Sequence, residues 1–127
     1  MPSQSGAELS ALLHAAQRLT GAKRVSLKCE TSVLETVYAE LRGDEIVIHD
    51  GGETWLYIAG HSNTHKAWDD ELVERLCVER AVTVEREFDG GDLVALRLER
   101  VLQDEGVADV VAAVGDLVDA VFDAHNI

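Results

Sequence analysis

The chain has 127 residues, the size of one compact domain, and 46% of them are hydrophobic. A composition this apolar argues against disorder over most of the chain, so we expect a single domain over residues 1–127. The 24 acidic residues against 11 basic ones give a formal net charge of −13. Because lysines and arginines form no cluster along the sequence, this balance argues against binding to nucleic acid or to anionic membranes.

The sequence also indicates a compartment. No apolar stretch approaches the roughly 20 residues that span a bilayer, and no segment resembles a signal peptide, so we expect a cytoplasmic protein. Cys29 and Cys77 occupy apolar positions of periodic patterns, which is typical of reduced, buried thiols. The acid excess indicates either a surface kept soluble by charge, for example in a halophilic host, or a face that attracts a basic partner.

The first predicted element is a helix over about residues 6–20. Ser5 and Glu8 form a capping-box pattern, leucines follow at helical spacing, and Gly21 supplies a stop. Alternating apolar residues then predict a half-buried strand over residues 25–29.

Residues 31–42 fit a helical stripe as well as strand alternation. Their Thr, Val and Tyr content favours a strand, which continues through Gly43 and Asp44 into the alternating pair Ile46 and Ile48, as in a hairpin. After a second turn at 50–52, both faces of residues 53–59 are apolar. That pattern predicts a central strand, or one covered by a helix or a second subunit.

Two helices and a hairpin complete the expected order. Helical spacing predicts a helix near residues 68–77, and alternation around Asp89-Gly90-Gly91 predicts a hairpin over 82–98. The repeated Asp-Gly-Gly turn hints at an internal repeat. Residues 104–125 form the clearest amphipathic helix. The predicted fold is α+β: helix, antiparallel meander of three or four strands, helix, β-hairpin and C-terminal helix.

This α-β-β-β-α-β-β-α plan, in a small acidic chain, resembles the class I chaperones of type III secretion. The resemblance covers residues 6–124 and rests on topology, size and acidity. It implies a module that binds another protein and dimerises through a helix or a sheet face.

The stretch GDEIVIHDGGETWLYIAG, followed by a helix, is also similar to a family of small prokaryotic and phage-borne α+β domains. Those domains commonly have an acidic-glycine motif where this chain has residues 66–70. Asp69 and Asp70 match that motif, whereas its glycine is missing. This resemblance likewise implies protein binding and not catalysis.

The stretch HSNTH places His61 and His65 four residues apart, with Asp69, Asp70 or His49 as candidates for a third metal ligand. Their position between two predicted elements favours a polar loop, and we expect neither a metal nor a cofactor there. The neighbours His49 and Asp50 form a candidate acid–base pair, although a solvated surface pair is the favoured interpretation.

Three functions stay open. We favour a non-enzymatic, chaperone-like or adaptor module that acts as a homodimer and binds another protein through Trp55, Tyr57 and Trp68. The alternative is a metal-dependent enzyme that uses His61, His65 and an aspartate. A further alternative is an acidic inhibitor that imitates nucleic acid. Basic residues interspersed on the predicted strands (Arg86, Arg97 and Arg100) argue against that last function.

Overall fold

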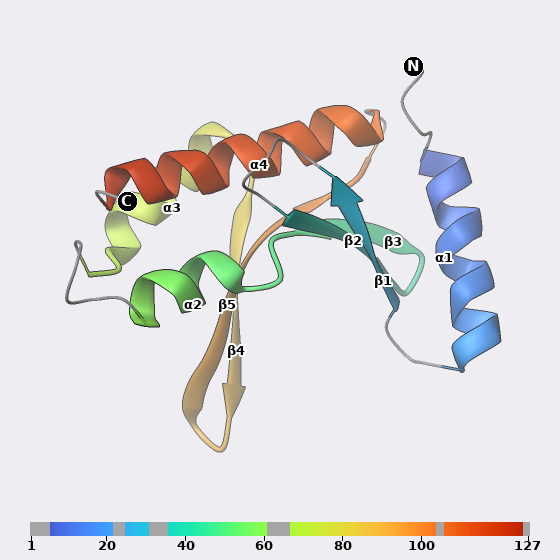
Figure 1. Cartoon of the computed structure of the whole chain (residues 1–127), viewed down its shortest axis with the longest axis horizontal. Coiled ribbons are helices and arrows are strands. Elements are labelled where there is room, and N and C mark those ends of the chain that lie inside the picture. The colour runs from blue at the N-terminus through green and yellow to red at the C-terminus, as the bar shows by residue number, and fades with distance from the viewer. Residues whose placement is uncertain (1–5, 22–24, 31–35, 61–66, 104–105, 126–127) are drawn as a thin grey trace.

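The computed structural model describes residues 6–21, 25–30, 36–60, 67–103 and 106–125. Within these ranges the chain forms four helices and five strands, which confirms the predicted α+β fold and adds one short helix (Figure 1). The elements in chain order are α1 (Gly6–Thr20), β1 (Val25–Glu30), β2 (Thr36–Arg42), β3 (Glu45–His49), α2 (Glu53–Gly60), α3 (Asp70–Glu79), β4 (Thr83–Asp89), β5 (Asp92–Val101) and α4 (Val107–Ala124). None of the helices in these ranges combines the length and the apolarity needed to cross a membrane.

All strand pairs of the sheet are antiparallel, in the order β1-β2-β3-β5-β4. β1, β2 and β3 form the predicted meander, and β4 and β5 form the predicted hairpin. The strand chosen within residues 31–42 is confirmed for residues 36–42, which form β2. Residues 31–35 lie outside the described part of the chain, as does Ser5 of the capping box.

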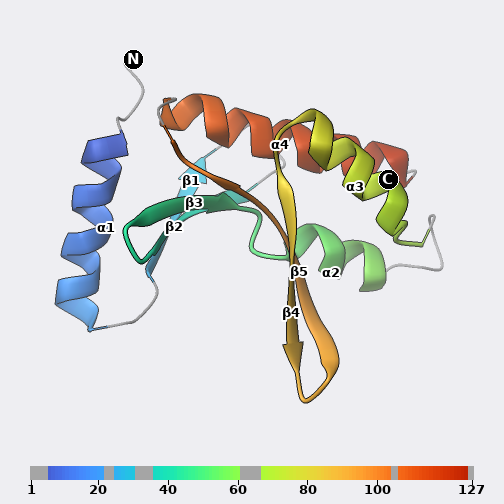
Figure 2. The same ribbon diagram turned by 180° about the vertical axis from the view of Figure 1, so that it is seen from behind.

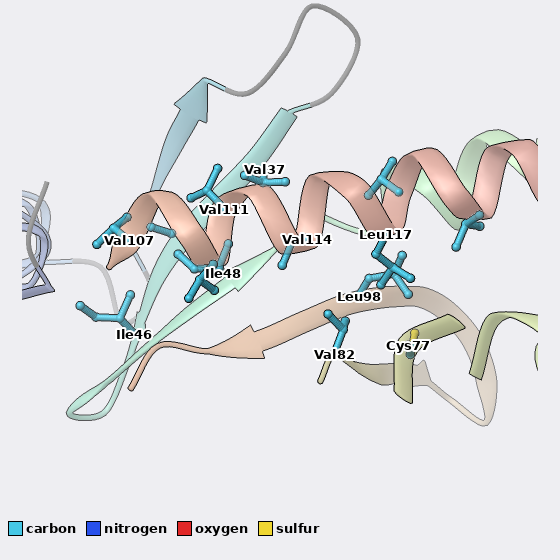
Figure 3. Close-up of a cluster of buried hydrophobic side chains, with 14 of the residues drawn as sticks. Val37, Ile46, Ile48, Cys77, Val82, Leu98, Val107, Val111, Val114 and Leu117 are labelled. Atoms are coloured by element: carbon cyan, nitrogen blue, oxygen red, sulfur yellow. The ribbon is translucent and has the colours of Figure 1, made fainter. Parts of the chain in front are cut away.

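The core lies between one face of the sheet and α4, which runs across it (Figure 3). The labelled side chains Val37, Ile46, Ile48 and Leu98 of the sheet lie on the side of α4, as does Val82, just before β4. The apolar stripe predicted for the last helix is the one buried here, and Leu9 and Leu13 of α1 join the same cluster. Each fully buried aliphatic side chain contributes about 1.5–3 kcal/mol. Cys77 is a buried free thiol in this core, as predicted.

Residues 53–59, predicted to be a strand, form helix α2 instead. Their buried side chains are Thr54 and Ile58, four residues apart, while Leu56 and Tyr57 are exposed. A spacing of four is about one helical turn, whereas a strand would bury every second residue. The apolar residues that were expected on the two faces of a strand are therefore distributed around a helix, and only the side with Thr54 and Ile58 is buried.

The turn before α2 explains this difference. The Asp50 carboxylate accepts hydrogen bonds from the backbone N–H groups of Gly52 (2.9 Å) and Thr54 (3.4 Å), as a helix N-cap does. The second Asp-Gly-Gly turn, at residues 89–91, closes the β4–β5 hairpin. Because one turn starts a helix and the other joins two strands, the suggested internal repeat is not present.

The hairpin of β4 and β5 projects from the body of the molecule. Figures 1 and 2 show from opposite sides that its tip extends beyond the helices. A register shift between Glu87 and Phe88 marks the start of this projecting part, where Phe88 and Val94 are exposed. We call residues 87–95 the arm.

The surfaces from which a homodimer was predicted are not available as expected. The strand over 53–59 does not exist, and the apolar stripe of α4 is covered by the protein's own sheet and neighbouring helices. A homodimer would therefore need a different surface.

Candidate functional site

Exposed apolar side chains lie on two neighbouring elements, α2 and the β4–β5 hairpin. The start of α2 contacts β5, and an added Cβ at Gly52 would lie 3.4 Å from the carbonyl oxygen of Leu96. Leu56 on α2 and Phe88 on the arm are each 64% exposed. We call Leu56, Tyr57, Phe88 and Val94 the arm surface. Such groups in water are typical of a protein contact.

The three residues predicted to bind a partner have different surroundings. Tyr57 belongs to the arm surface, with its ring edge-on to Phe122 of α4 at a centroid distance of 5.7 Å. Trp55 is half-buried on the same helix. Trp68 is also half-buried and packs against the core near the start of α3. Trp55 and Tyr57 thus share α2, whereas Trp68 belongs to a different junction.

The junction at Trp68 joins the start of α3 to the end of α4. The ring of Trp68 stacks on that of His125, with centroids 5.7 Å apart, and its Nε1–H donates to Asp70 (2.9 Å). The fully buried His125 donates from Nδ1 to the carbonyl of Val121, which leaves Nε2 to accept the backbone N–H of Asp69 at 3.0 Å. Trp68 therefore has a structural role in addition to its partly exposed surface.

The sheet face turned away from α4 holds a network of buried ion pairs. Glu40 and Arg42 alternate with the core residues of β2, and the register places His49 opposite Glu99. Arg42 binds both oxygens of Glu99 at 2.9 and 3.0 Å and one oxygen of Glu40 at 2.7 Å. Arg97 also pairs with Glu99, at 3.6 Å. A fork of this kind holds two carboxylates that would otherwise repel each other.

His49 lies inside this network and not at the surface. Its Nδ1 accepts the backbone N–H of Gly51 at 2.9 Å, so Nε2 carries the proton and lies 3.9 Å from Glu40. Burial lowers the pKa of His49 more than the nearby glutamates raise it. Above the ring, Tyr38 stacks on His49 and donates to Glu53 (2.8 Å), and this bond raises the pKa of Tyr38.

The interpretation of His49 and Asp50 as a solvated surface pair is wrong, because both residues are at least 95% buried. The Asp50 carboxylate is occupied by backbone N–H groups, including that of Leu98 at 3.0 Å. Neither side chain is therefore presented to a substrate in the way that acid–base catalysis requires.

The metal hypothesis rests on residues that the structure describes only in part. His61 and His65 lie outside the described residues. Asp69 caps α3 by accepting the N–H of Leu72 at 3.2 Å, and Asp70 binds Trp68. Across the described ranges, no three His, Cys, Asp or Glu side chains are grouped so that they could hold a metal ion. The Cys77 thiol is a weak nucleophile, since burial raises its pKa to about 11.

Comparison with protein-family models, with curated proteins and with solved structures found no match for this chain. The site must therefore be judged from its own geometry. The sequence predicted Tyr57 as a partner-binding residue and did not single out Phe88 and Val94, which lie in the predicted hairpin over 82–98. Phe88 directly precedes the Asp-Gly-Gly turn, and Val94 follows it by three residues. Large apolar residues close to a predicted hairpin turn were the signal that could have identified both as exposed contact residues.

Proposed function

We propose that this protein is a non-enzymatic protein-binding module, chaperone-like or adaptor-like, that acts as a homodimer in the cytoplasm. The observation that supports partner binding is the arm surface. Phe88 and Val94 are exposed on a hairpin that projects past the helices, and Leu56 and Tyr57 are exposed on α2, the helix that contacts β5 of this hairpin. A projecting arm offers a partner an accessible apolar contact, and aromatic residues are favoured anchors at such contacts.

The charges around the arm surface favour one kind of partner. Glu53 lies at the start of α2, and Asp89 and Asp92 flank the turn of the arm. Together with the net charge of −13, these acids favour an apolar segment flanked by basic residues.

The proposal is tested by affinity capture from the native host, with the full chain as bait and two matched variants. Phe88→Asp removes the exposed ring from the arm. Val78→Asp makes a similar change at an 80% exposed apolar residue of α3, outside the arm surface. We expect a protein that is retained by the wild type and by Val78→Asp and lost with Phe88→Asp. Calorimetric titration of that protein should then show at least about a tenfold weaker Kd for Phe88→Asp, equivalent to about 1.4 kcal/mol.

Equal retention of each captured protein by all three baits would contradict the role of the arm surface. Circular dichroism and the melting temperature of each variant check that the fold is intact, which is expected because both substituted side chains are exposed.

A further inference from the structure

We propose that two copies of this protein pair through the outer face of α1, with the two helices antiparallel. This inference rests on the homodimer of the proposed function and names the surface that forms it. The outer face of α1 consists of Glu8, Ala11, Leu12, Ala15, Arg18 and Leu19, on the side opposite the buried Leu9 and Leu13.

The first observation is exposed leucine on this face. Leu19 is 88% exposed and Leu12 is 51% exposed. They are seven residues apart, so they lie on one stripe of the helix, with Ala15 between them. Glu8, Leu12, Ala15 and Leu19 follow spacings of four, three and four residues, which is the spacing of a seam between two helices.

The second observation is charge. The outer face of α1 has one acid, Glu8 in the first turn, and one base, Arg18 in the last turn, so it is neutral. Two copies with a formal charge of −13 each repel one another, and a neutral face is where they approach at least electrostatic cost. The outer side of α4, with Asp109, Asp116 and Asp119 exposed, is an unsuitable face for the same reason.

The antiparallel arrangement follows from the order of residues along α1. A two-fold axis near the middle of the helix places Leu12 opposite the partner's Ala15, so that a large side chain meets a small one. The same axis places Glu8 opposite the partner's Leu19 and one position from the partner's Arg18, which can pair with it. A parallel arrangement would instead bring Glu8 next to Glu8 and Arg18 next to Arg18, which is repulsive.

The position of α1 leaves the arm surface free. Both views place α1 at one end of the molecule, away from α2 and α3. A dimer formed through α1 therefore leaves α2 and the arm of both copies uncovered. Since one pair of 15-residue helices buries less than the roughly 1,200 Å² of a standard interface, we expect a weak dimer with Kd on the order of 10–100 μM.

Sedimentation equilibrium of the full chain over about 5–500 μM tests this pairing. We expect a monomer–dimer equilibrium for the wild type. The dimer Kd should rise at least about tenfold for Leu19→Glu and stay unchanged for Val78→Glu. Arg18→Glu alone should weaken the dimer about tenfold, because both symmetric contacts become repulsive. The double variant Glu8→Arg with Arg18→Glu should restore it.

Two results overturn the inference, and they differ in what they imply. A monomer at every concentration removes the homodimer of the proposed function together with this interface. A dimer that is insensitive to Leu19→Glu and to the charge exchange keeps the homodimer and places its contact elsewhere. Circular dichroism of Leu19→Glu confirms that α1 is still formed.

Discussion

The carboxylate of Asp50 accepts a hydrogen bond from the backbone N–H of Leu98, 3.0 Å away and 48 residues later in the chain. The same carboxylate caps the start of α2. One buried side chain thus fixes both the helical start of α2 and its attachment to β5, the strand that returns from the arm.

Replacement of Asp50 by alanine is therefore expected to destabilise the fold strongly. The backbone N–H groups of Gly52, Thr54 and Leu98 lose their acceptor inside the protein, so we expect the free energy of unfolding to fall by about 2–4 kcal/mol. Asp50→Asn keeps one oxygen and should cost less. Urea unfolding measures both. Asp44→Ala, in the exposed β2–β3 turn, is the control and should stay within about 0.5 kcal/mol.

Arg42 is expected to stabilise the fold because it joins two buried carboxylates. Arg42→Met removes the bidentate partner of Glu99 and one ion pair of Glu40, and we expect a loss of about 2–3 kcal/mol, moderated by the 36% exposure of the Arg42 side chain. Arg86→Met is the matched control, since Arg86 pairs with the exposed Asp70 and Glu74. It should cost less than about 1 kcal/mol. Equal losses in urea unfolding would show that burial of the network does not matter.

His49 predicts a dependence of stability on pH. Burial lowers its pKa in the folded protein below the ordinary 6.5, so the unfolded chain binds a proton that the folded chain does not. The contribution of His49 to stability is complete above pH 6.5 and declines as the pH falls toward the folded-state pKa. Unfolding free energies at several pH values should fall less steeply for His49→Gln than for the wild type. NMR titration of the His49 ring checks the pKa itself; a value at or above 6.5 would contradict the account.

Substitutions in the HSNTH stretch should have little effect on stability, whereas substitution of Trp68 should have a large one. We expect His61→Asn combined with His65→Asn to change the unfolding free energy by no more than about 0.5 kcal/mol, as at a polar connection. Trp68→Ala should cost about 2–4 kcal/mol, because its half-buried ring packs on the core and on His125. Metal analysis of protein prepared without chelators should find no stoichiometric ion. The reverse order of stabilities, or a bound metal, would favour the enzyme hypothesis with His61 and His65 as ligands.

The sequence alone determined those helices and strands whose apolar residues fit only one periodicity, either that of a helix or that of a strand. The last helix was predicted because seven of its buried side chains repeat at helical spacing (Val107, Val110, Val111, Val114, Leu117, Val118 and Val121), and the β4–β5 hairpin because alternation surrounds Asp89-Gly90-Gly91. Tyr57, predicted from sequence to bind a partner because aromatic residues are frequent anchors, is exposed on α2.

Tertiary contacts decided the rest. The apolar residues on both faces of residues 53–59 predicted a strand. A helix forms instead because Asp50 caps it while bound to Leu98, a contact that no local pattern reveals. The charged residues of β2 and β5 alternate with apolar ones, a pattern that is typical of a solvated face. They are buried instead because Arg42 meets Glu99 from 57 residues away, and only the pairing of β3 with both strands brings those side chains together.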